Sequence, residues 1–220
     1  MTLAFRHNIR TCITNGRVVI LDLDKADYLC LPDDIELVLQ KALSSSELSA
    51  SERDCIRELI EDGLLVETSA PQSPLAPPLP APTEEFPASR GDIKWWNICI
   101  ALSFHVIAAT ALTVLPLTKA VTPKRPRRIP QAMSAPQIRA TLRHAANIFE
   151  ASERLYPSNN KCLRRSLALA KFLTTQGIAT KLVIAVKMRP FGAHAWVQFD
   201  DVVVNDTLDN VRPFTPIYVV

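Results

Sequence analysis

The chain has 220 residues, enough for one medium-sized or two small domains, and its apolar fraction of 48% is ordinary for a globular protein. Its formal net charge of +3 hides an asymmetry: residues 1–70 carry 7 Lys and Arg against 13 Asp and Glu, and residues 71–220 carry 18 against 9. Opposite charges of −6 and +9 predict two domains. The acidic first part argues against nucleic-acid binding, because such binding depends on neutralising phosphates.

The cysteines are widely spaced and form no CxxC pair: Cys12, Cys30, Cys55, Cys99 and Cys162. An odd number without metal-ligand spacing predicts free thiols in a reducing compartment, with no disulfide framework and no metal site. The first ten residues lack the apolar segment of a signal peptide, so we expect a cytoplasmic protein. The sequence contains no phosphate loop, and we expect no cofactor.

Residues 1–68 are expected to form a small α+β domain. Strands over 6–14 and 17–21 flank Asn15-Gly16, the strongest short signal for a two-residue hairpin turn. The other expected elements follow in order: a strand over 26–31, a helix from Pro32-Asp33-Asp34 to Leu43, a helix from Ser51 to Asp62 with Asp54 in an acidic capping box, the helix-ending Gly63, and a strand over 64–67. This order is that of a winged-helix-like domain.

Two motifs in this domain, Gly16-Arg17-Val18-Val19-Ile20-Leu21-Asp22 and Leu59-Ile60-Glu61-Asp62-Gly63-Leu64-Leu65, resemble the precursor-peptide recognition domains of the PqqD-like fold. Such domains bind a leader peptide as an extra strand at the edge of a sheet. By this resemblance the third strand and the second helix form the leader groove, with Tyr28, Leu29, Cys30, Ile56, Leu59 and Ile60. The alternative, that these are core residues, applies to about half of them.

Residues 69–90 contain seven prolines and predict an extended, semi-rigid spacer. Residues 91–220 then form the second expected domain. It opens with an uncharged run, Trp95 to Leu117, which is long enough to cross a bilayer and is followed by basic residues. Polar residues interrupt this run, so we prefer a buried or surface-docked helix, with peripheral contact to anionic lipid as a second interpretation.

The sequence from Asn159 to Leu173 predicts a helix, because its apolar residues recur with helical spacing. Pro157 stops the preceding helix, which Ser134-Ala135-Pro136 opens, and Ser158, Asn159 and Asn160 can each cap the new one. Cys162 therefore falls in the first turn, where unpaired N–H groups and the helix dipole favour a thiolate. Alone, such a cysteine is more often a buried apolar residue than a nucleophile.

Residues 191–199 predict a strand paired with 202–206, after a strand over 181–187. His194 and Asp206 share a face only if the loop between the strands is odd, such as Phe199-Asp200-Asp201 with Asp201 in the left-handed region. A two-residue turn would place them on opposite faces. With an odd loop, Asp206 can orient His194, and His194 can take the proton of Cys162.

Several blocks of this second part resemble the leader-peptidase half of lasso-peptide maturation proteins, the B proteins: Cys162-Leu163-Arg164-Arg165-Ser166-Leu167-Ala168-Leu169, Gly177-Ile178, Ala193-His194-Ala195-Trp196-Val197 and Asn205-Asp206. The resemblance implies a papain-related, transglutaminase-like fold. It also implies that Cys162 is the nucleophile, His194 the general base and Asp206 the orienting acid. Asn160 is a candidate donor to the oxyanion, and Trp196 either lines the substrate groove or packs in the core.

By the same resemblance, the protein binds a ribosomal precursor peptide by its leader and cleaves the leader from the core. A partner similar to asparagine synthetase then closes the macrolactam with ATP. Two alternatives stay open. One is a non-catalytic precursor-peptide chaperone with an inactive peptidase fold. The other is a transglutaminase-like acyl transferase that passes the acyl group to an amine instead of water.

Overall fold

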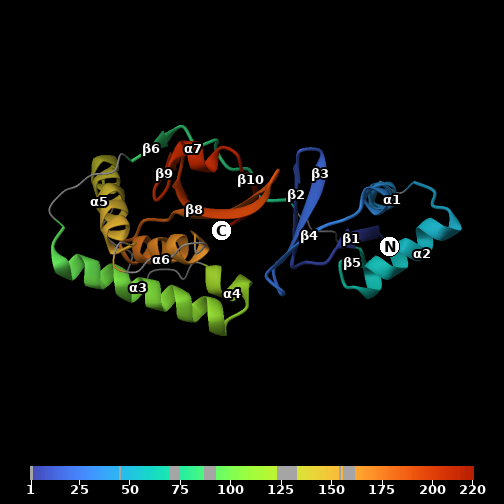
Figure 1. The fold of residues 1–220 in the computed structure, drawn as a ribbon, viewed down its shortest axis with the longest axis horizontal. Coiled ribbons are helices and arrows are strands. Elements are labelled where there is room, and N and C mark those ends of the chain that lie inside the picture. Colours follow the sequence, from blue (N-terminus) through green and yellow to red (C-terminus); the bar gives the residue numbers. More distant parts are fainter. Residues whose placement is uncertain are drawn as a thin grey trace. The chain divides into compact units, whose positions relative to one another are not determined.

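The computed structural model describes residues 2–44, 46–69, 75–86, 93–122, 133–153, 155 and 162–220. The chain contacts divide it into two compact units, Met1–Ala76 and Pro77–Val220, which are labelled by element in Figure 1. The division lies inside the expected spacer over 69–90. Both units mix helices and strands, as the α+β expectation requires.

Unit 1 contains a three-stranded antiparallel sheet in the order β2-β3-β4. Its strands are β2 (Ile9–Thr14), β3 (Arg17–Asp22) and β4 (Asp27–Cys30). Asn15 and Gly16 form the expected two-residue turn, with φ values of 50° and 74°. Thr14 pairs with Arg17 and the ladder continues without a break to Ile9 and Asp22. The hairpin prediction is confirmed in both turn and register.

A second small sheet in unit 1 pairs β1 (Thr2–Phe5) with β5 (Leu65–Thr68). The sequence had indicated β5 but not β1. The helices are α1 (Asp33–Leu43) and α2 (Ala50–Glu61). The expected capping box of α2 was wrong by two residues: Ser49 accepts from the Glu52 amide, and the Glu52 carboxylate accepts from the Ser49 amide. Glutamate reaches back to the cap as aspartate cannot.

The core of unit 1 lies between its helices and its strands. Its buried apolar residues are Phe5, Ile9, Ile20, Leu31, Leu39, Ile56, Leu59, Leu64 and Leu65. The Glu36 carboxylate, itself buried, accepts from the Val18 amide at 3.0 Å and from Arg17 at 3.2 Å. A buried carboxylate requires such partners, so this contact fastens α1 to the start of β3.

Unit 2 is built on a five-stranded sheet in the order β10-β7-β8-β9-β6. Its strands are β6 (Glu84–Glu85), β7 (Lys181–Met188), β8 (Phe191–Phe199), β9 (Val202–Val203) and β10 (Thr215–Val219). All neighbours are antiparallel except β6, which runs parallel to β9. The expected β7 and β8 are both present.

The helices of unit 2 are α3 (Trp95–Val114), α4 (Leu117–Val121), α5 (Ala135–Glu153), α6 (Cys162–Thr175) and α7 (Leu208–Val211). Helix α6 packs against β7 and β8, and α3 packs against α5 and α6 (Figure 1). The buried side of α6 includes Leu167, Leu169 and Leu173, which recur at helical spacing. This packing fixes the start of α6 relative to the middle of β8.

Part of the expected spacer belongs to unit 2, which corrects the interpretation of 69–90 as a spacer alone. The amides of Thr83 and Glu84 donate to the Asp201 carbonyl at 2.9 and 3.2 Å, which aligns β6 with β9. The Pro80 carbonyl accepts from Gln198 at 2.8 Å. Two glutamates have weak strand propensity, so the open edge of β9, and not local sequence, makes this strand.

Candidate active site

The thiol of Cys162 lies at the first residue of α6, as the sequence predicted. The first N–H groups of a helix have no intrahelical acceptor, so they favour a negative charge at this position. The Cys162 side chain is half-buried. The residues expected to cap this helix, Ser158, Asn159 and Asn160, lie outside the described part of the chain, and Asn160 is therefore not placed as an oxyanion donor.

The ring of His194 projects from β8, where its Nε2 lies 2.6 Å from the Oδ2 of Asp206. Their side chains are 20% and 11% exposed, so the pair is shielded but reachable. The His194 ring lies between two aromatic rings, with centroid distances of 6.2 Å to Trp196 and 5.1 Å to Phe214. These rings restrict the imidazole to the orientation in which it meets Asp206.

The electrostatics of the three groups favour an ion pair between sulfur and imidazole. Burial raises the pKa of the Cys162 thiol, but the hydrogen bond and charge of His194, with the backbone of Ala195 and Leu163, outweigh burial and bring it below its ordinary value. The hydrogen bond that His194 donates to Asp206, followed by the one it makes with Cys162, raises the pKa of His194 to about 9. Cys162, His194 and Asp206 thus converge with the charges that a thiolate nucleophile needs.

Residues 104–219 match the family model described as the transglutaminase-like superfamily, which is more than half of the chain and includes all three converging residues. The chain belongs to the transglutaminase-like superfamily. That superfamily includes cysteine peptidases and acyltransferases, and its catalysis is typically based on cysteine. No curated protein and no solved structure matches the chain.

The hairpin of the transglutaminase-like domain differs from the expected register. Phe199 pairs with Val202, so Asp200-Asp201 form a two-residue turn in place of the expected three-residue loop. The residue in the left-handed region is Asp200, with φ 51°, and not Asp201. In a continuous strand pair, such a turn separates His194 from Asp206 onto opposite faces. That rule does not apply here, because the strand does not continue as far as Asp206.

The ladder stops where a side chain replaces the backbone. The Val204 amide still donates to the Val197 carbonyl at 2.9 Å, but the Val197 amide donates to Oδ1 of Asn205 at 2.8 Å. Residues 204–206 form a bend instead of a strand. The chain therefore leaves the alternation of the strand at Asn205, and Asp206 turns back towards His194.

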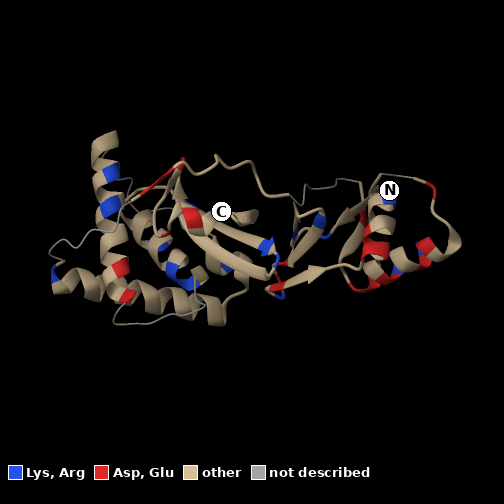
Figure 2. Cartoon of the chain, turned by 45° about the horizontal axis from the view of Figure 1, so that its top comes forward, with Lys and Arg blue, Asp and Glu red and all other residues tan. Residues whose placement is uncertain are grey.

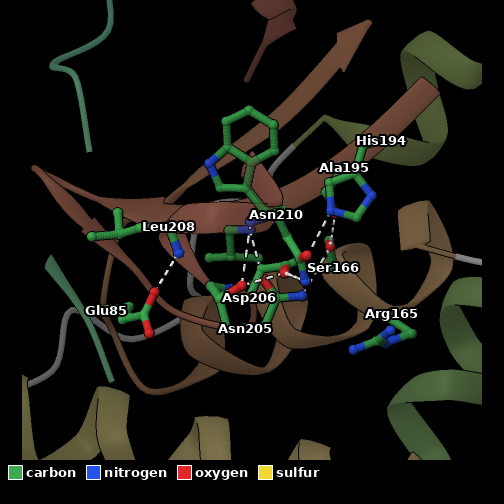
Figure 3. Close-up of polar contacts among 12 residues, drawn as sticks. Glu85, Arg165, Ser166, His194, Ala195, Asn205, Asp206, Leu208 and Asn210 are labelled. Atoms are coloured by element: carbon green, nitrogen blue, oxygen red, sulfur yellow. Dashed lines mark hydrogen bonds and ion pairs between the residues drawn. The ribbon is translucent and has the colours of Figure 1, made fainter. Parts of the chain in front are cut away.

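Asn205 also joins the hairpin to the cysteine helix, as Figure 3 shows. Its Nδ2 donates to the Ser166 hydroxyl at 3.0 Å, and that hydroxyl donates to the Ala195 carbonyl at 2.9 Å. Ser166 is fully buried, one turn after Cys162. The network thus links α6, β8 and the bend through three hydrogen bonds. Sequence reasoning placed both Ser166 and Asn205 in the resembling blocks but gave neither a role.

The Asp206 carboxylate has further donors on its other oxygen. The Thr207 amide donates to Oδ1 at 2.8 Å and the Asn210 side chain at 2.9 Å. Burial raises the pKa of Asp206, but the hydrogen bonds from His194, Asn210 and Thr207 outweigh it and lower that pKa. Nearby, Glu85 of β6 accepts from the Leu208 amide (Figure 3). Asp206 is therefore held as a carboxylate.

The remaining residues expected at the site are placed as follows. Trp196 is buried and donates to Gln198 at 3.1 Å, so it packs and does not line an open groove. Arg165, three residues after Cys162, pairs with Glu153. No group of three or more His, Cys, Asp and Glu among the described residues is arranged to hold a metal ion.

In unit 1, the residues expected to form a leader groove fall into two sets. Ile56 and Leu59 are core residues, which corrects their assignment to the groove. Leu29 and Ile60 are partly buried against that core, Tyr28 is half-buried and Cys30 is exposed. Among the described strands, β4 pairs with β3 on one side alone. The edge of β4 is therefore the part of the expected groove that a peptide strand could reach.

Proposed function

We propose that this transglutaminase-like protein is a cysteine peptidase that holds a ribosomal precursor peptide by its leader and cleaves the leader from the core, as in lasso-peptide biosynthesis. The convergence of Cys162, His194 and Asp206 at the start of α6 carries the proposal. The resembling blocks around these residues supply the substrate class. We assign leader binding to unit 1, because its two motifs resemble PqqD-like domains and its strand β4 has an open edge.

The proposed reaction begins with attack of the Cys162 thiolate on the scissile carbonyl. His194, protonated at neutral pH because Asp206 raises its pKa, donates that proton to the leaving amine, and a thioester remains on Cys162. Water activated by neutral His194 then adds to the thioester, and the leader leaves with a free carboxylate. The unpaired N–H groups of the first turn of α6 are the available donors to the oxyanion.

A substrate-free experiment tests the thiolate. Iodoacetamide at about pH 6 should alkylate Cys162 well before Cys12 and Cys55, because thiolate content sets the rate. Burial raises the pKa of Cys12 to about 11 and also raises that of Cys55, whereas the pKa of Cys162 is lowered. Peptide mass mapping measures the order. His194→Ala should slow labelling of Cys162 alone. Equal labelling in wild type and His194→Ala would contradict the proposed pair.

A second experiment tests the reaction itself. The purified full chain is incubated with the precursor peptide encoded beside it, with and without the synthetase-like partner, and the products are identified by mass spectrometry. The wild-type protein should cleave the precursor into two fragments. With Cys162→Ala or His194→Ala the precursor should stay intact. Cys99→Ala, which removes an exposed cysteine outside the candidate active site, should cleave normally. Leader release that persists in Cys162→Ala would contradict the peptidase and favour the non-catalytic chaperone. A crosslinked product would indicate acyl transfer to an amine.

A further experiment tests the role of unit 1. Cys30→Pro in β4 should weaken binding of the leader peptide, because the register places the Cys30 amide on the open edge of the strand and proline removes that donor. The alkylation rate of Cys162 should stay unchanged, since it depends on unit 2. Leader affinity is measured by fluorescence anisotropy with a labelled leader. The same change at Ile13 of β2, which is exposed, is the control for general loss of the sheet.

A further inference from the structure

One face of α3 exposes a continuous row of side chains to solvent. The exposed residues recur every three to four positions: Trp95, Trp96, Cys99, Ile100, Ser103, Val106, Ile107, Thr110, Thr113 and Val114. The large apolar side chains among them are 43% to 72% exposed. A soluble monomer rarely leaves such a contiguous apolar surface uncovered, so the row points to something that covers it.

The opposite face of α3 is already occupied. Ala101, His105 and Ala108 are buried there against α5 and α6. His105 lies 3.1 Å from the Ser152 hydroxyl of α5, and Phe104 packs edge-on against Phe172 of α6 with a centroid distance of 5.5 Å. The polar His105 therefore faces the protein. Helix α3 is apolar on both sides, but only its outer side lacks a partner within the described part of unit 2.

Two of the three exposed hydroxyls on the outer face are bonded to their own helix. The Ser103 hydroxyl donates to the Ile100 carbonyl at 2.7 Å, and the Thr113 hydroxyl donates to the carbonyls of Ala109 and Thr110, each at 3.0 Å. A hydroxyl that is bonded to its own helix can enter hydrocarbon without losing a water bond. This face can therefore be desolvated without an unsatisfied group among these hydroxyls.

The charge pattern favours lipid over protein as the covering partner. No charged residue occurs from Trp95 to Thr118, and α3 is accordingly tan in Figure 2. Protein interfaces surround their apolar centre with a polar rim, which this helix lacks along its length. Exposed cations stand at its two ends: Lys94, whose Nζ lies 5.0 Å from the Trp96 ring centre, and Lys119 of α4. Tryptophan and lysine at the ends of an apolar helix are typical of membrane interfaces.

We infer that the outer face of α3 docks unit 2 on an anionic lipid surface, with the helix lying in the plane of the membrane. Helix α3 is the one described helix that is long and apolar enough to cross a bilayer by length and composition. A crossing would separate Ala101, His105 and Ala108 from α5 and α6 and place His105 in lipid without Ser152. In-plane docking keeps that packing and buries the exposed row. The net charge of +9 over residues 71–220 adds attraction to acidic headgroups.

Flotation of the full-length protein with vesicles tests this inference. Vesicles of phosphatidylcholine mixed with a quarter phosphatidylglycerol should carry the wild-type protein to the top of the gradient, and pure phosphatidylcholine vesicles should carry less. The double variant Val106→Glu/Ile107→Glu should lower the partition coefficient at least about ten-fold, because charge in the apolar region is costly. Ile13→Glu is the matched control: Ile13 of β2 is 65% exposed and Val106 61%. This control should float like wild type.

Tryptophan fluorescence gives a second readout. Trp95 and Trp96 are exposed and should shift to shorter wavelength when anionic vesicles are added, whereas Trp196 is buried and should not respond. Wild-type protein that stays unbound with both vesicle types, or a Glu double variant that floats equally well, would overturn the inference. A double variant that instead changes a dimer into a monomer in light scattering would assign the face to a second copy. Extraction with alkaline carbonate should release the protein; retention would indicate a spanning helix.

Discussion

The β2–β3 and β8–β9 hairpins both turn through two residues, yet only the first follows the alternation of a regular strand pair. In β2–β3 the ladder is continuous from the Asn15-Gly16 turn to Ile9 and Asp22. In β8–β9 the strand ladder has two residue pairs before the Asn205 side chain takes the place of a backbone acceptor. The regular β2–β3 hairpin contributes to the core of unit 1. The interrupted β8–β9 hairpin places the Asp206 carboxylate within hydrogen-bond distance of His194.

The difference teaches where counting along a strand is reliable. Two-residue periodicity predicts facing residues as long as backbone groups bond to backbone groups. Once a side-chain amide replaces a backbone carbonyl as the acceptor, the alternation of side chains between the two faces of the sheet ends. The following residue can then lie on either side. Asn205 and Ser166 hold this departure in place, and Asp206 depends on it.

Removing the carboxylate at the end of the interrupted hairpin should have the largest effect. Asp206→Asn should lower kcat about 10³- to 10⁴-fold, because the amide no longer holds the His194 imidazolium in its orientation. Cleavage of the precursor under saturating conditions measures this. Asp209→Asn is the control, since its side chain is 95% exposed, and it should stay near wild type. Activity of Asp206→Asn within a few-fold of wild type would remove Asp206 from the mechanism.

Replacing the amide that interrupts the ladder comes next. Asn205→Ala deprives the Val197 amide of its acceptor and the Ser166 hydroxyl of its donor, so the Asp206 bend loses its attachment. We expect kcat to fall about 10- to 100-fold with KM little changed, because a small displacement of a reacting group is costly. Ser166→Ala should have a smaller effect, and the double variant should match Asn205→Ala alone. A lowered Tm with normal kcat would mean that Asn205 only stabilises the fold.

The pH profile distinguishes positioning from stability. Below the raised pKa of His194 the imidazolium is present, so wild-type kcat/KM should decline on the alkaline side as pH passes about 9. The hydrogen bond that His194 donates to Asp206 is the largest cause of that rise. Asp206→Asn should therefore move the alkaline limb to lower pH, and Asn205→Ala should move it in the same direction by less. An unmoved limb in both variants would contradict the coupling of the bend to His194.

In the regular hairpin, the expected effect is confined to stability. Gly16 has φ 74°, and a Cβ there would meet no atom within 4 Å. Gly16→Ala should therefore lower stability only because alanine disfavours this left-handed backbone conformation. The cost should be about 1 to 2 kcal/mol in the unfolding of unit 1, measured by urea denaturation. Asn15→Gly should be nearly neutral, since glycine adopts a φ of 50° freely. Alkylation of Cys162 should be unchanged in both variants.

The smallest effect is expected at the turn of the interrupted hairpin. Asp200 has φ 51°, so Asp200→Gly removes backbone strain and should stabilise unit 2 by about 0.5 kcal/mol. Asp201→Gly should do the opposite, because the Asp201 side chain accepts from Thr83. Thermal unfolding of the two variants measures the contrast. Stabilisation by both changes would mean that the Thr83 contact contributes nothing.

Local signals predicted much of the fold. The Asn15-Gly16 turn, the start of α6 at Cys162 and the whole of β8 depend on neighbours in sequence, and the structure contains each of them. Strand β1 was missed because Thr2–Phe5 has no strand signal apart from its pairing with Leu65–Thr68, far along the chain. For α2 the sequence predicted a box of Ser51 with Asp54, but the box closes at Ser49, which has Glu52 three residues later.

The candidate site was predicted in its members but not in its construction. His194 and Asp206 meet as expected, but by a route that the periodicity of a strand does not contain. The role of Asn205 depends on Val197 and Ser166 together, and no single-sequence pattern specifies such a three-way contact. The sequence also left open whether Trp196 and Ile56 line a groove or pack in a core. Only the packed fold shows that both are buried.

The strand β6 sets a limit on how the two units can be exchanged between proteins. Pro80, Thr83, Glu84 and Glu85 bond to Gln198, Asp201 and Leu208, so these residues complete the edge beside the Asp206 bend. A chimaera that joins a foreign N-terminal unit at residue 91 would leave that edge unpaired and prone to pairing with strands of other chains. A junction placed between 76 and 80 keeps the edge sealed, and it is where modular swaps should begin.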